Sequence, residues 1–263
     1  MDSKQTREYW DGNADAWTKL SRAGYDTYRD HLNTPSFFEM LPNVDDLEGI
    51  DIGCGEGYNT RLLAQRGARI VGIDVSERFV EHARTMEKQN PLDIEYAVAD
   101  ACDLQFEDDR FDFATAFMSM MDIPTPDQAI AEAFRVLMPG GFFQFSISHP
   151  CFDTPHRVNK RHKGGMTYAM EVGDYFAKPD GRVMEWLFSA APTEAKQGLS
   201  PFKVPRFTMT LSSWLNMLLD AGFVIERVAE PMPSDEIVQR FPNLQDAQVV
   251  AYFLHVRVCK PLG

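Results

Sequence analysis

The sequence predicts an α/β protein built on a doubly wound, mostly parallel β-sheet. Short apolar runs alternate with helical patterns between about residues 48 and 148, as in a sheet whose parallel strands are joined by helices. Glycines and acids gather where the apolar runs end, and ligands bind at that edge of such sheets. With 263 residues, 44% of them hydrophobic, the chain can bury one large core. We therefore expect one domain with a ligand site at the carboxyl ends of its strands.

The first predicted strand runs into a glycine-rich turn, Asp-Ile-Gly-Cys-Gly-Glu-Gly at residues 51–57. Glycine lacks a Cβ, so this backbone can turn sharply and approach a nucleotide-type cofactor closely. The spacing G-x-G-x-G differs from the G-x-G-x-x-G of dinucleotide sites, which disfavours NAD and FAD. Asp51 adds a negative charge that would attract a cationic group such as an ammonium.

Four further strands and three helices follow in alternation. The second strand ends at Asp74, which lies 21 residues after Gly53, the separation at which such units present a carboxylate to a ribose. The third strand ends in the same way, at Asp100. The strands are predicted at 69–74, 94–100, 111–117 and 141–147, and the helices at 58–66, 76–88 and 127–137, the last stopped by Pro139-Gly140-Gly141.

Together these motifs resemble the class I S-adenosylmethionine-dependent methyltransferases, in particular their small-molecule branch. The resemblance rests on IDIGCGEG, VGIDVS, VADACDLQF, FDFATAF and RVLMPGGFFQFS, which follow one another between Ile50 and Ser148, with a looser match at 214–222 and in the C-terminal strands. It implies a Rossmann-like, seven-stranded sheet with an antiparallel last strand, N-terminal helices and a lid insertion after the fifth strand. The expected single domain comprises a helical cover (1–45), a cofactor-binding core (46–148), a substrate lid (149–206) and a C-terminal helix with strands that complete the sheet (207–263).

The resemblance also implies the cofactor, S-adenosylmethionine, and its product, S-adenosylhomocysteine. The residues that it places at the cofactor are Asp51, Gly53, Cys54, Gly55, Asp74, Val75, Asp100, Ala101 and Phe117. Asp51 and the glycines would line the methionine end, and Asp74 would bind both ribose hydroxyls. Val75 would pack on the adenine, whose amino group would donate to Asp100 beside the Ala101 backbone. Phe117 would begin the loop between cofactor and substrate.

Residues 1–45 lie outside the sheet pattern and begin with a predicted helix at 7–20, which carries Trp10 and Trp17 on one side. In related methyltransferases such helices fold over the cofactor, and an aromatic–arginine pair contacts its carboxylate. Tyr28 and Arg29 are the candidates for that pair. In the alternative interpretation, the aromatic side chains only cover the sheet edge and Arg29 is a surface charge.

The segment 149–206 is rich in aromatic residues and prolines, which suits a lid over an apolar or planar substrate. Its basic run at 156–163 could hold a carboxylate or phosphate, or be a solvated loop. The separations of His149, Cys151, His156 and His162 fit no familiar metal site, so no metal is expected.

Methyl transfer needs a general base only when the nucleophile must lose a proton. His149 directly follows the fifth strand, at the edge where the methyl group would project, and is the leading candidate for that base. The alternative is a structural histidine bonded to loop backbone before Pro150. Asp122 and Tyr175 are secondary candidates.

The overall charge limits the choice of partner. The net charge of −13 repels phosphate backbones, so nucleic acid is not an expected substrate. No apolar window approaches ~20 residues and no signal peptide is evident, so we expect no membrane partner and a cytoplasmic location, as a monomer or homodimer. The favoured function is methyl transfer to a small-molecule acceptor by in-line displacement. The alternatives are a nicotinamide-dependent oxidoreductase and a non-catalytic S-adenosylmethionine-binding protein, and the sequence leaves open whether N, O, C or S is methylated.

Overall fold

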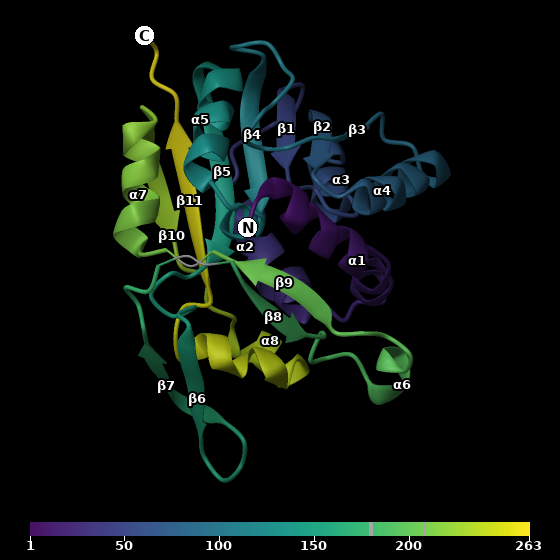
Figure 1. The fold of residues 1–263 in the computed structure, drawn as a ribbon, viewed down its shortest axis with the longest axis vertical. Helices are drawn as coiled ribbons and strands as arrows, with labels where there is room; N and C mark the ends of the chain where they lie inside the picture. The colour runs from purple at the N-terminus through teal and green to yellow at the C-terminus, as the bar shows by residue number, and fades with distance from the viewer. Residues whose placement is uncertain (179–180, 208) are drawn as a thin grey trace.

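The computed structural model describes residues 1–178, 181–207 and 209–263. Its centre is one seven-stranded sheet in the order β3-β2-β1-β4-β5-β11-β10 (Figure 1). The first five of these strands pair in parallel, whereas β11 runs antiparallel to both of its neighbours. The predicted fold class, with its antiparallel last strand, is therefore confirmed. The strands of the sheet are β1 (Glu48–Ile52), β2 (Arg69–Asp74), β3 (Glu95–Val98), β4 (Phe111–Phe117), β5 (Leu137–Ser148), β10 (Val224–Ala229) and β11 (Phe253–Cys259).

Some of the helices begin at capping side chains. At the first, Asp2 accepts from the backbone N–H of Gln5, whose side chain accepts from that of Asp2 in return. The hydroxyl of Ser76 accepts from Phe79 N at 3.1 Å at the start of α4. The α-helices are α1 (Ser3–Arg22), α2 (Thr34–Met40), α3 (Tyr58–Ala64), α4 (Glu77–Gln89), α5 (Pro126–Val136), α6 (Thr193–Lys196), α7 (Leu211–Asp220) and α8 (Asp235–Arg240), and the other helical turns are η1 (Arg29–Asn33), η2 (Met120–Asp122) and η3 (Pro242–Gln248).

Both faces of the sheet are covered, because the buried side chains of its strands alternate between two apolar clusters. Ala114 and Ala116 of β4 face a cluster that includes α5 and α7. Phe113 and Phe117 of the same strand face the opposite cluster, which includes α2, α3 and α4. This two-sided burial is what parallel strands joined by helices require.

Two boundaries differ from the sequence prediction in ways that matter near the site. β3 ends at Val98, so Asp100 lies in the turn after the strand. β5 begins at Leu137, directly after α5, so Pro139-Gly140-Gly141 is part of an irregular strand start. Gly140 has a left-handed backbone (φ +85°) and donates to Lys260 O at 2.8 Å. This turn, which glycine adopts easily, lets the start of β5 bond to the residue that directly follows β11.

The segment after β5 folds into two small antiparallel pairs, β6 (His156–Arg161) with β7 (Thr167–Gly173), and β8 (Arg182–Trp186) with β9 (Phe202–Arg206). The β6–β7 hairpin projects from the end of the molecule that is remote from the C-terminus (Figure 1). Residues 179 and 180 of the segment lie outside the described residues.

The β8–β9 pair packs on α1. The Asn13 side chain donates to Lys203 O at 2.9 Å and accepts from Lys203 N at 2.8 Å, so it binds β9 as another strand would. The Trp17 ring lies 5.0 Å from that of Phe188 and 4.8 Å from that of Phe202, measured between centroids. The N-terminal helix and the segment after β5 thus form one structural unit.

Candidate active site

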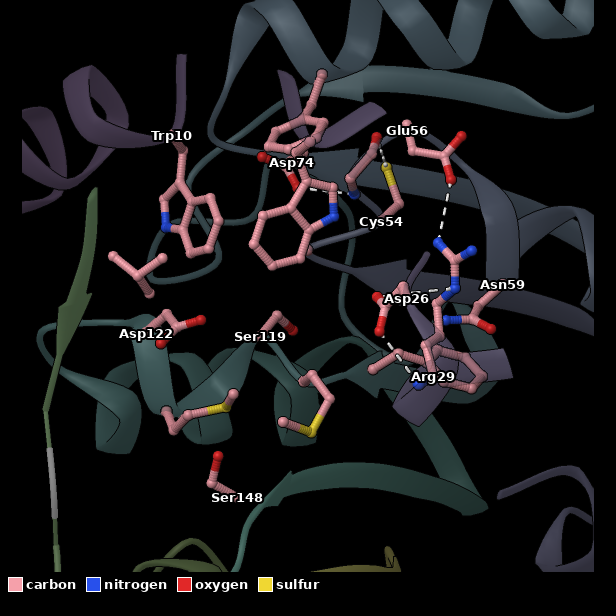
Figure 2. Close-up of a pocket in the computed structure, with 18 of the residues that line it drawn as sticks. Trp10, Asp26, Arg29, Cys54, Glu56, Asn59, Asp74, Ser119, Asp122 and Ser148 are labelled. Carbon is pink, nitrogen blue, oxygen red and sulfur yellow. Dashed lines mark hydrogen bonds and ion pairs between the residues drawn. The ribbon is translucent and has the colours of Figure 1, made fainter. Parts of the chain in front are cut away.

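A cavity of about 550 Å³ lies at the carboxyl ends of β1, β2 and β4, beneath α1 and the β8–β9 pair. In Figure 2, Trp10 and Asp122 lie at the left of the cavity, and Arg29 and Glu56 lie at the right. We call the side around the β1 and β2 ends (Asp51, Gly53, Gly55, Asp74) the cofactor end. We call the side around Trp10, Asp122 and Arg206 the acceptor end.

The glycine turn shapes the cofactor end. Gly53 N and Cys54 N both donate to Ile73 O at 2.8 Å, which fixes the turn to β2. Gly53 has φ +73°, and a Cβ there would lie 2.3 Å from the Cβ of Ser119, so no other residue fits. Gly55 has φ +55°, but a Cβ there would meet no atom within 4 Å. The backbone of Gly55 is therefore open to the cavity.

Asp74 lies at the end of β2 and also holds this turn. Its Oδ2 accepts from Gly55 N and its Oδ1 from Ser76 N, both at 2.8 Å. Burial raises the pKa of Asp74 to about 6, against the opposing effect of these two hydrogen bonds. A ligand that donates hydrogen bonds to the carboxylate would favour its ionised form.

Asp51 is only 1% exposed and accepts from two threonine hydroxyls. Thr60 Oγ1 lies 2.6 Å from its Oδ2, and Thr115 Oγ1 lies 2.8 Å from its Oδ1. Burial raises the pKa of Asp51 to about 6, and the nearby charge of Asp74 adds to the rise. The two acids give the cofactor end a negative potential when both are ionised.

All of the residues that the sequence placed at the cofactor line this one cavity. They are Asp51, Gly53, Cys54, Gly55, Asp74, Val75, Asp100, Ala101 and Phe117, together with Tyr28 and Arg29. Asp100 is oriented by the backbone of its own turn, because its Oδ1 accepts from Cys102 N at 2.9 Å.

Arg29 is not a surface charge, because its side chain is only 13% exposed. Its guanidinium lies 2.8 Å from Asp30 and 3.5 Å from Glu56, and it stacks on the Tyr58 ring at 3.8 Å. Tyr28 lines the cavity, its hydroxyl donates to Asn243 O at 2.7 Å, and its ring stacks on that of Tyr252. Acids surround Arg29, which allows its positive charge to stay buried beside the cofactor end.

The acceptor end is aromatic and contains one buried ion-pair network. Arg206 donates to Ser148 Oγ at 3.0 Å and to Asp153 Oδ2 at 2.6 Å, and its Nη1 lies 3.5 Å from Asp122 Oδ1. Asp122, Ser148 and Arg206 line the cavity, but Asp153 does not. The aromatic residues that also line this end are Trp10, Trp17, Trp186 and Phe188.

The prediction that His149 is the general base is not supported, because His149 is buried outside the cavity lining. Its Nε2 lies 2.7 Å from Glu230 Oε1, and its Nδ1 accepts from Cys151 N at 3.2 Å. With both ring nitrogens engaged, this arrangement favours the alternative, a structural histidine. Tyr175 likewise does not line the cavity, and its hydroxyl accepts from Leu211 N at the start of α7.

Most of the basic run at 156–163 does not face the cavity either. His156 and Lys160 both pair with Glu171 of β7, and Arg161 pairs with Asp246. Arg157 alone of this run lines the cavity, where it stacks on the Tyr252 ring at 4.4 Å.

Several lining residues were missed by reasoning from the sequence, among them Asn33, Glu56, Ser119 and Arg206. Glu56 could have been found, because it lies within the glycine turn. Met118, which adopts a left-handed backbone (φ +55°) between β4 and η2, gave no local signal. Such strain in a residue other than glycine is common at functional sites.

Comparison with known proteins agrees with this geometry. Residues 50–145 match a family described as a methyltransferase domain. The ubiquinone biosynthesis O-methyltransferase of Coxiella burnetii is 31% identical over 119 residues, which are 44% of this chain and 51% of that protein. Methyltransferase GfsG of Streptomyces halstedii is 36% identical over 111 residues, 41% of this chain and 40% of that protein. The chain thus matches about half the length of these curated relatives.

A solved structure extends the likeness over most of the chain. The S-adenosylmethionine-dependent methyltransferase of Mesorhizobium loti superposes with a TM-score of 0.69 at 27% identity, covering 86% of this chain and 96% of that one. Fold, glycine turn and strand-end acids agree with a class I methyltransferase domain, which the family match places at residues 50–145. The Mesorhizobium protein, which the chain resembles over most of its length, depends on S-adenosylmethionine.

The cofactor end fits this molecule. Its acids suit a ligand with an ammonium group and ribose hydroxyls, and the backbone of Gly55 leaves room for close approach. None of the helices in the described residues combines the length and apolar character that crossing a membrane requires.

Proposed function

We propose that this protein transfers a methyl group from S-adenosylmethionine to a small, planar or partly apolar acceptor by in-line displacement. The observation that carries the proposal is one continuous cavity with an acidic cofactor end and an aromatic acceptor end. Holding the acceptor against the methyl group can contribute about 7–11 kcal/mol of barrier lowering. The Coxiella relative is named for O-methylation in ubiquinone biosynthesis, which supports a small acceptor.

The residues of the chain divide the work between binding and orientation. Asp51 and Arg29 would hold the ammonium and the carboxylate of the cofactor, with the Tyr28 ring beside them. Asp74 and Asp100 would bind the ribose and the adenine. The bound cofactor supplies an electrophilic methyl group on a sulfonium. The aromatic side chains of the acceptor end would exclude water and orient the acceptor.

Segment 149–206 would act as the substrate lid and residues 1–45 as the helical cover. We propose a monomer or a homodimer as the active unit.

The proposal is tested first by binding. We expect saturable binding of S-adenosylhomocysteine in calorimetry, with no saturable binding of NADH as the control. Asp74→Ala should weaken S-adenosylhomocysteine binding about 10- to 100-fold or more, since it removes charged hydrogen bonds worth ~1.5–3 kcal/mol each. Labelled S-adenosylmethionine should then transfer its methyl group to members of a panel of small planar acceptors. Binding without transfer to any acceptor would refute the enzymatic function.

A further inference from the structure

Asp122 stands out at the acceptor end as a buried acid with an unused acceptor atom. It belongs to η2, immediately after β4, and is 6% exposed. Its side chain lines the same cavity as Trp10, on the same side of the view (Figure 2). Its Oδ1 is enclosed by protein on the side of Arg206, and none of the described residues donates a short hydrogen bond to it. Its Oδ2 likewise accepts no hydrogen bond from the described residues, and it is the oxygen that stays accessible. A buried carboxylate without a short hydrogen bond is costly, which suggests that a ligand in the cavity donates to Oδ2.

Arg206 holds the Asp122 carboxylate in place without donating a short hydrogen bond to it. The Nη1 of Arg206 lies 3.5 Å from Asp122 Oδ1, close enough for an ion pair but not for a good hydrogen bond. Its other nitrogen, Nη2, is taken up by Ser148 and Asp153. Burial raises the pKa of Asp122 to about 7, and the charge of Asp153 adds to the rise, whereas the charge and hydrogen bonding of Arg206 oppose it.

We propose that Asp122 accepts the proton of an aromatic hydroxyl group, so that the acceptor of this enzyme is a planar alcohol methylated on oxygen. This inference rests on the proposed function. A bond forms between the acceptor oxygen and the methyl carbon, the methyl–sulfur bond breaks and leaves a neutral sulfur, and the O–H proton passes to Asp122 Oδ2 and then to solvent. Arg206 is a positioning residue in this scheme.

The presence of a base selects among nucleophiles. A neutral amine already has a lone pair, and a thiol with a pKa of about 8.5 is partly ionised near neutral pH. A phenol-type hydroxyl, with a pKa of about 10, gains most from a base of nearly neutral pKa. The aromatic rings that line the same cavity as Asp122 favour a planar acceptor that carries such a hydroxyl.

A matched pair of probes tests the contact without turnover. We would measure quenching of tryptophan fluorescence as 2-naphthol, or its methyl ether 2-methoxynaphthalene, binds to the S-adenosylhomocysteine complex. The parent should prefer 2-naphthol by about tenfold or more, because only 2-naphthol can donate to Asp122. Asp122→Asn should lose most of this preference and keep its S-adenosylhomocysteine affinity. Asp153→Asn, which alters the same network outside the cavity lining, should retain the preference.

Turnover supplies the second test, with a series of aromatic alcohols of increasing acidity. The rate loss in Asp122→Asn should be ~10²–10⁴-fold for weakly acidic acceptors and should shrink for those already ionised at the assay pH. Equal binding of the two probes by the parent, an unchanged preference in Asp122→Asn, or the same rate loss for every acceptor would overturn the inference. Failure of the proposed function differs from these, because the parent would then bind S-adenosylhomocysteine and transfer no label at all.

Discussion

The two ends of the cavity are built in different ways. The cofactor end consists of turns that directly follow neighbouring parallel strands, and its main acids, Asp51 and Asp74, lie within those strands. The acceptor end is assembled from α1, η2, the end of β5 and the β8–β9 pair, which are far apart in the chain. Backbone hydrogen bonds therefore position one end, and side-chain packing positions the other.

This difference implies that changes at the two ends should have separable effects. The acids of the cofactor end are held by backbone N–H groups and buried hydroxyls. The acceptor end depends on contacts such as those between Asn13 and Lys203, and between Arg206 and Asp153. A variant that affects both ends equally would break the comparison.

The largest effect is expected from Gly53→Ala. Its Cβ would lie 2.3 Å from that of Ser119, in a backbone with φ +73° that only glycine adopts easily. We expect loss of measurable S-adenosylhomocysteine binding together with a lower melting temperature.

Gly55→Ala is the matched control, because its Cβ would point into open space. Its melting temperature should fall by less, with a left-handed backbone penalty of ~1–2 kcal/mol. Its affinity for S-adenosylhomocysteine should still fall, since the added methyl group of the alanine would occupy the cavity. If Gly53→Ala bound S-adenosylhomocysteine normally, the turn would not shape the cofactor end.

A second large effect is expected from Arg29→Ala. Removal of a charged partner from a partly buried carboxylate costs ~2–5 kcal/mol, so S-adenosylhomocysteine affinity should fall about 30-fold or more. Arg22→Ala is the control, because Arg22 also pairs with Glu56, at 2.7 Å, but does not line the cavity. Calorimetry should show near-parental affinity for Arg22→Ala. Equal losses in the two variants would mean that Arg29 acts only by neutralising Glu56.

The cofactor end was predictable from the sequence because each of its residues lies in a local motif that also ends a strand. Asp74 and Gly53 needed only the spacing between two such ends. The acceptor end was not predictable, because Asn13 and Lys203 lie 190 residues apart and no local pattern pairs them. Asp122 and Arg206 also lie far apart in the chain, although less far than Asn13 and Lys203. His149 shows the same limit, since its position after β5 is local, whereas its contact with Glu230 is not.

A smaller effect concerns pH and again separates the two ends. The pKa values of Asp51 and Asp74 are about 6 in the folded protein, above the usual 3.8. Their ionisation therefore disfavours folding, and the unliganded protein loses stability from them as pH rises from 3.8 to 6. Binding of the cofactor favours the ionised forms, so its affinity should rise over the upper part of this range.

Between pH 5 and 7 the ionised fraction of a group with a pKa of about 6 rises about tenfold, so S-adenosylhomocysteine affinity should rise about tenfold per carboxylate. Calorimetry in buffers of different ionisation enthalpy should detect the proton release. Asp51→Asn should reduce the rise in affinity between pH 5 and 7 to about tenfold, the contribution of the one remaining carboxylate. Asp122→Asn should leave it unchanged, because Asp122 belongs to the acceptor end. A flat profile in the parent would show that neither acid changes its ionisation on binding.

The smallest effect on function is expected at His149. This residue directly follows Ser148, which lines the cavity, but His149 itself does not line it. His149→Ala removes the contacts with Glu230 and Cys151 N, so we expect a loss of ~1–3 kcal/mol of stability and a melting temperature lower by a few degrees. S-adenosylhomocysteine affinity and turnover should stay within a few-fold of the parent.

Glu230→Gln isolates one of the two contacts of His149. The Glu230 side chain is 56% exposed, so its loss should cost no more than ~1 kcal/mol. His149→Ala should therefore lose more stability than Glu230→Gln, and neither variant should lose turnover. If His149→Ala instead lost ~10²-fold or more in turnover at an unchanged melting temperature, His149 would be the base after all. The role assigned to Asp122 would then have to be withdrawn, because a single hydroxyl proton needs only one acceptor.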